Sequence, residues 1–87
     1  MTLSPTLITL DALATGQRAT VVHIAPGNPA TGTDVARRLM ELGFVPGEPV
    51  RLLKRGIPGG EPLAVRVGES TFALRRFEAA LISVAPE

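Results

Sequence analysis

The chain has 87 residues, of which 45% are hydrophobic, an amount of apolar material that suits one small hydrophobic core. Its formal charge of +1 lacks the basic excess of proteins that bind duplex nucleic acid through the phosphates, so we expect no nucleic-acid partner. The absence of cysteine excludes disulfides, thiolate metal centres and a thiol nucleophile, and it suits a cytoplasmic location. We therefore expect residues 1–87 to form a single domain whose core covers about 7–85.

The first strand is expected at residues 17–24, an apolar and β-branched run. Residues 33–43 have a different period, because their apolar side chains recur on one stripe at 100° intervals while Arg37, Arg38 and Glu41 lie opposite. This pattern predicts one amphipathic helix. Gly43 is expected to end it in the left-handed conformation, so that Phe44 packs back on the helix, and residues 45–48 read as a type II turn.

The rest of the chain predicts further short strands at residues 50–55, 63–67, 71–75 and 81–84, with one helical turn at 76–80. Gly and Pro residues separate the middle strands and favour hairpins. Five short strands bury an apolar face without long open edges when they curl into a barrel. We therefore expect an all-β fold with one inserted helix: a small five-stranded, partly open barrel.

The sequence contains no arrangement of residues typical of a catalytic site. The chain has a single histidine and three widely separated serines, and Gly59 and Gly60 are not followed by the lysine of a phosphate-binding loop. We expect no enzymatic activity and no resident cofactor. His23 is expected to be an exposed side chain near a strand end, and at most a weak divalent-metal ligand shared with a nearby carboxylate or a second molecule.

Two surfaces are candidates for binding a partner. The helix offers Arg37, Arg38, Met40, Glu41 and, just after its end, Phe44, although half-burial of the apolar ones against the barrel explains them as well. The strands carry a second group of cations, which is either a solvated outer face or a docking patch for an acidic surface: Arg51, Lys54, Arg55, Arg66, Arg75 and Arg76. The chain has no Tyr or Trp, and its three phenylalanines, Phe44, Phe72 and Phe77, are expected in the core.

The order and spacing of three blocks resemble the FeoA family of small proteins that accompany the ferrous-iron permease FeoB. The opening block has Leu10, Leu13, Gly16, Ala19, Val21 and Ile24. The central block has Arg38, Leu39, Glu41, Leu42, Gly43, Phe44, Pro46, Gly47 and Val50. The closing block has Glu61, Pro62, Val65, Phe72, Ala73, Leu74, Arg75, Glu78, Ala79, Ile82 and Val84.

This resemblance implies a barrel of the Src-homology-3 (SH3) type. It also implies a non-enzymatic accessory protein of ferrous iron transport and iron homeostasis that docks on the cytoplasmic part of the FeoB membrane GTPase, and so meets the membrane only through that partner. The alternative is a regulatory or dimerisation module like the C-terminal barrel of iron-dependent transcriptional repressors. The docking surface and the formation of homo-oligomers are left open by the sequence.

Overall fold

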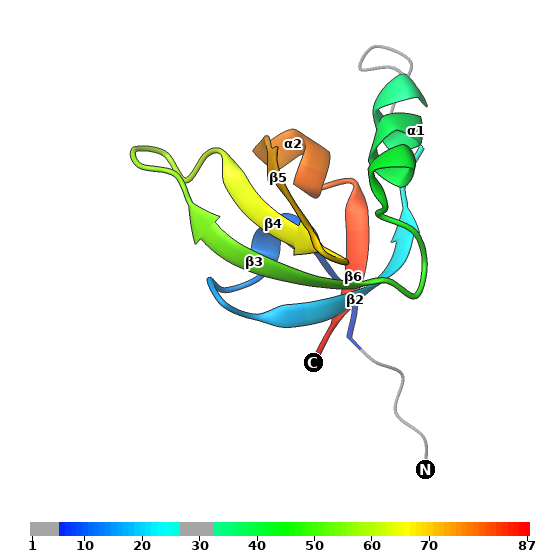
Figure 1. Ribbon diagram of the computed structural model, residues 1–87, viewed down its shortest axis with the longest axis horizontal. Helices are drawn as coiled ribbons and strands as arrows, with labels where there is room; N and C mark the ends of the chain where they lie inside the picture. Colours follow the sequence, from blue (N-terminus) through cyan, green and yellow to red (C-terminus); the bar gives the residue numbers. More distant parts are fainter. Residues whose placement is uncertain (1–5, 27–32) are drawn as a thin grey trace.

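The computed structural model describes residues 6–26 and 33–87, and its main feature is one strongly bent antiparallel sheet (Figure 1). The strands are β1 (Ile8–Thr9), β2 (Arg18–Ile24), β3 (Pro49–Arg55), β4 (Leu63–Val67), β5 (Ser70–Leu74) and β6 (Ile82–Pro86). The helices are the 3₁₀ helix η1 (Leu10–Ala12), α1 (Thr33–Leu42) and α2 (Arg76–Ala79). The strand order is β1-β6-β2-β3-β4-β5.

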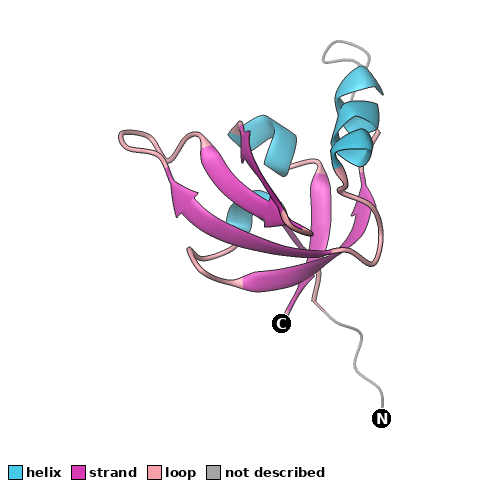
Figure 2. Ribbon diagram, in the orientation of Figure 1, coloured by secondary structure: helices cyan, strands magenta, loops and turns pink. Residues whose placement is uncertain are grey.

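Two β-bulges bend this sheet. Val22 is the extra residue where β2 pairs with β6, because Val21 lies opposite Val84 while His23 lies opposite Ser83. Leu53 is the extra residue where β3 pairs with β4. A bulge kinks its strand and increases the local twist, so the two bulges help the sheet to curl around one core. Figure 2 shows the curled strands, with the short helix α2 above them and the longer helix α1 at one side.

The core lies inside the curl and is built from alternate strand residues. On β4, for example, Leu63, Val65 and Val67 are buried while Arg66 is exposed, as expected for a sheet with one face in the core and one in water. Most of the large buried side chains belong to the strands, and the others belong to the helices η1 and α1 or to the residues just after them. The largest fully buried side chains are Leu10, Leu13, Val21, Leu39, Phe44, Leu52, Leu63, Val65, Leu74, Ile82 and Val84.

The structure confirms the class of fold and corrects the number of strands. All five expected strands and the inserted helix are present, and residues 76–79 form the expected helical turn. The sheet of the described residues has a sixth strand, β1, which pairs with β6 through only two residues and therefore has no sequence periodicity to reveal it. No pairing joins β1 to β5 in residues 6–26 and 33–87, so the barrel is open there.

None of the helices in the described part of the chain is long and apolar enough to cross a membrane.

Candidate partner-binding surface

Helix α1 is fastened to the barrel along one face. Ala36 and Leu39 are buried, and Val35 and Leu42 are partly buried against the core cluster. These residues recur at intervals of three and four, which places them on one stripe of the helix. The helix therefore has a fixed orientation, and the side chains on its other face are presented to solvent.

The C-terminal end of α1 has the hydrogen bonds of a Schellman motif. The N–H of Gly43 donates to the carbonyl of Met40 at 3.0 Å, and the N–H of Phe44 donates to the carbonyl of Leu39 at 3.1 Å. Gly43 has φ +118°, a conformation that L-residues rarely adopt. The expected ending is confirmed, and it directs the Phe44 ring into the core, where its centroid lies 6.1 Å from that of Phe72.

The turn after α1 is also fastened to the sheet. The N–H of Glu48 donates to the carbonyl of Val45 at 3.0 Å, and Gly47 has φ +92°, as expected for the type II turn. The N–H of Gly47 donates to the carbonyl of Val21, and the N–H of Val21 donates to the carbonyl of Glu48. The helix and the turn that follows it thus form one rigid unit on strand β2.

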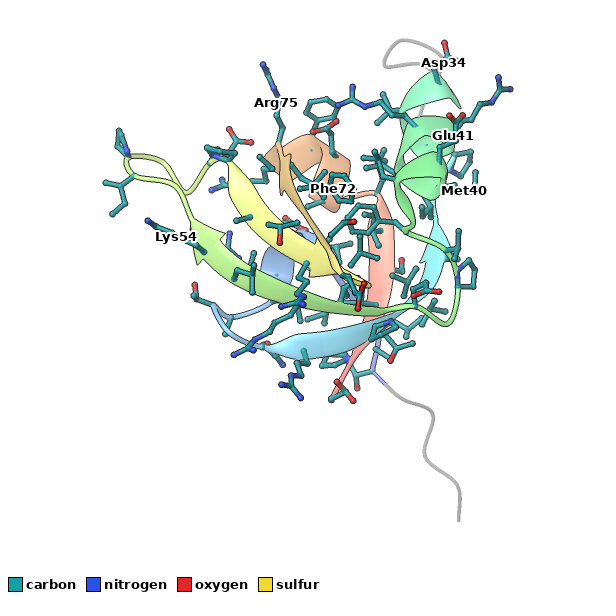
Figure 3. The ribbon with its side chains drawn as sticks, in the orientation of Figure 1. Asp34, Met40, Glu41, Lys54, Phe72 and Arg75 are labelled. Atoms are coloured by element: carbon teal, nitrogen blue, oxygen red, sulfur yellow. The ribbon has the colours of Figure 1, made fainter. Side chains whose placement is uncertain are left out.

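The exposed face of α1 carries four of the five residues that were predicted to bind a partner. Arg37, Arg38, Met40 and Glu41 are exposed, and Met40 exposes 45% of its surface (Figure 3). Phe44 does not belong to this surface, because it is fully buried and contacts no solvent. We call the four exposed residues the α1 face.

One of the three phenylalanines differs from its predicted place in the core. Phe77 was expected in the core, but it lies on α2 with 48% of its surface exposed. The reason is the helical period of this short turn, which buries Glu78 and Ala79 instead. The Glu78 carboxylate stays satisfied there, because its Oε1 accepts a hydrogen bond from the N–H of Arg75 at 2.8 Å.

His23, which the sequence offers only as a weak candidate for a metal ligand, is exposed on β2 directly after the bulge residue Val22. No group of three or more His, Cys, Asp or Glu side chains that could hold a metal ion occurs in residues 6–26 and 33–87. The imidazole therefore has the exposed position that the sequence predicted, and the described chain does not surround it with a set of ligands.

The strand cations that the sequence grouped together have different roles in the structure. The Arg55 Nη2 donates to the backbone carbonyls of Asp11 and Leu13, and so ties β3 to η1. The Arg76 Nη2 donates to the carbonyl of Gly59 at 2.9 Å. Figure 3 shows Lys54 on β3 and Arg75 beyond β5, with their side chains directed away from the core. Only Arg51 and Arg66 lie side by side, on paired positions of β3 and β4.

A small, strongly bent antiparallel β-sheet with one helix packed at its side is an SH3-like fold. The FeoA domain model matches residues 8–86, so the chain belongs to the FeoA domain family. No curated protein matches the chain.

Solved structures agree with this assignment. The chain is similar to the FeoA protein of Stenotrophomonas maltophilia, with 44% identity, a TM-score of 0.79 and coverage of 88% of both chains. That protein was crystallised with zinc and is described as an SH3 domain protein proposed to act as a bacterial ferrous iron transport activating factor. The FeoA protein of Chlorobium tepidum is 37% identical, with a TM-score of 0.75 and coverage of 91% of this chain and 70% of the other.

The fold also occurs in a manganese-dependent transcriptional repressor, whose structure matches 98% of this chain and 44% of its own with a TM-score of 0.81 and 21% identity. The structure of T. acidophilum IdeR matches 99% of this chain and 37% of its own with a TM-score of 0.72. The identity is only 16%, so this likeness concerns the fold alone.

Proposed function

We propose that this chain is a non-enzymatic accessory protein of ferrous iron transport, which docks through the α1 face on the cytoplasmic part of a FeoB-type permease. Membership of the FeoA family and the role described for the S. maltophilia protein support the transport assignment. The observation that carries the choice of surface is the exposure of 45% of Met40 on a helix whose other face is anchored in the core.

The α1 face combines the features of a partner contact. A flexible thioether adapts to an apolar partner surface, and the charged neighbours Arg37, Arg38 and Glu41 supply the polar rim that such contacts have. The helix is already ordered by the Gly43 ending and the turn on β2, so docking costs little conformational entropy.

The experiment is co-purification of the permease with variants of this protein. The triple variant Arg37→Ala, Met40→Ala, Glu41→Ala keeps good helix formers on α1 and removes one cation, one anion and one exposed apolar side chain. A matched control, Lys54→Ala, Ile57→Ala, Glu69→Ala, removes the same three kinds of exposed group from the β3–β4–β5 region.

Both variants should melt close to the parent, since all six side chains are exposed. The amount of permease that co-purifies with the α1 variant should fall about tenfold if the α1 face contributes about 1.4 kcal/mol to the free energy of binding. The control should retain it. A control that loses the permease while the α1 variant keeps it would place the docking surface at the other end of the barrel.

The alternative, a regulatory or dimerisation module of the repressor type, is supported by the shared fold alone. Sedimentation equilibrium of the parent protein tests it. A stable dimer that the α1 triple variant disrupts would favour this alternative, because the same face would then be occupied by a second copy of the chain.

A further inference from the structure

Three arginines form a continuous row across the outer face of the sheet. Arg18 on β2 lies directly opposite Arg51 on β3, and Arg51 lies directly opposite Arg66 on β4. All three are exposed, while their neighbours Ala19 and Val50 point inward and are buried. The next position of the row, on β5, is Thr71. We call Arg18, Arg51 and Arg66 the arginine row.

The row borders a hollow of about 340 Å³ on the protein surface, which Pro49 and Gly68 also line. The N–H of Glu87 donates to the carbonyl of Arg18 at 3.0 Å, so this acidic residue stands beside the β2 end of the row. Glu87 lies at the rim of the hollow and is the one acidic lining residue among those described there. Three guanidinium groups and one carboxylate thus line one open depression, which has an excess of positive charge.

Two like-charged pairs lie directly opposite each other in this row, Arg18 with Arg51 and Arg51 with Arg66. Like charges at directly opposite positions of neighbouring strands are destabilising. Arg51 uses its Nε to donate to the carbonyl of Gly16 at 3.1 Å, and the Nε of Arg66 makes a long contact of 3.4 Å with the carbonyl of Gly68. Both bonds use the Nε atom of the side chain and do not use the two terminal nitrogens, which together can bind a carboxylate bidentately.

We propose that the arginine row is a second binding site, separate from the α1 face, and that it holds an extended acidic segment of a partner protein. Neighbouring strands are about 4.8 Å apart, so three strands spread the cations over about 10 Å. One small anion bridges two of them at most, whereas an extended segment with carboxylates on alternate residues presents its charges about 6.6 Å apart, within reach of flexible arginines. The Thr71 hydroxyl adds a donor at the end of the row.

The test uses a fluorescein-labelled hexaglutamate peptide and fluorescence anisotropy at low salt, so no permease is present and the result is independent of the proposed docking on it. The double variant Arg51→Gln, Arg66→Gln should weaken binding by about tenfold, which corresponds to about 0.7 kcal/mol for each lost ion pair. The control Lys54→Gln, Arg75→Gln removes two exposed cations elsewhere and should stay within about twofold of the parent.

Circular dichroism should show the same fold for the parent and both variants. Equal losses in the double variant and its control would mean that only net charge matters, and would overturn the site. The acidic-segment assignment would also be overturned if inorganic triphosphate bound the parent more tightly than hexaglutamate and lost that binding in the double variant. The assignment would likewise be overturned if phosphatidylglycerol vesicles bound the parent through the arginine row and hexaglutamate did not bind it.

Discussion

The replacement Gly43→Ala isolates the cost of one backbone conformation. A Cβ at this position would lie 3.8 Å from the nearest methyl groups, those of Val67, which is an ordinary van der Waals distance. The substitution therefore creates no clash, and its whole effect comes from holding an L-residue at φ +118°. Strain in such sparsely populated regions costs about 2 kcal/mol.

Relaxing the strain does not rescue the variant. If residue 43 moved to a negative φ, the bond from the Phe44 N–H to the Leu39 carbonyl would break, and the buried Phe44 ring would leave its place beside Phe72. A loss of about 2 kcal/mol lowers the melting temperature of a domain of this size by roughly 8–16 °C. Gly43→Val should lose at least as much, since a β-branched residue is more strained there.

Differential scanning calorimetry measures the loss, and Gly68→Ala is the matched control. Gly68 has φ +58°, inside the left-handed region that L-residues occupy at a cost of about 1 kcal/mol, and a Cβ there would meet nothing within 4 Å. Gly43→Ala should therefore melt lower than Gly68→Ala. Equal melting temperatures for Gly43→Ala and the parent would refute the account of the helix ending.

Two further substitutions test the closing turn and the histidine. Glu78→Ala removes the acceptor of the Arg75 N–H and should cost about 1 kcal/mol in urea unfolding, whereas the exposed Glu69→Ala should change stability by less than about 0.5 kcal/mol. His23→Ala should remove whatever weak zinc binding calorimetric titration detects in the parent, without changing its melting temperature, because the side chain is exposed. Tight zinc binding that survives in His23→Ala would contradict the assignment of this imidazole.

The parts of the fold that local chemistry determines could be predicted from the sequence. The apolar stripe of α1, the stop at Gly43 and the turn at residues 45–48 each depend on residues close together in the chain, and all three are found as expected. On β4, the apolar residues Leu63, Val65 and Val67 alternate with Ala64 and Arg66 in the sequence, and these three are the buried ones. These features can be predicted without knowing which strands pair with each other.

The parts that depend on pairing could not be predicted. β1 has only two residues and exists because β6 lies beside it. The bulges at Val22 and Leu53, which help to bend the sheet, lie where two apolar residues are adjacent, but an adjacent pair does not by itself show that one of them is an extra residue in the strand pairing. Phe44 was interpreted in two ways from the sequence, as a residue packed back against the helix ending and as a surface contact, and the structure shows that the first is right because the residue is fully buried.

The arginine row is the clearest case of a site that depends on register. The sequence places Arg51 and Arg66 on the outward faces of their strands, but it does not show that they lie opposite each other, and Arg18 stands apart from the other basic residues in the chain. A register shift of one residue would turn every side chain of a strand to the other face. The burial of Val50 and Val67, which are paired between β3 and β4, therefore fixes the neighbouring arginines side by side. The core contacts that specify the fold thus also impose the charge repulsion on the outer face, and an acidic segment bound there would relieve it.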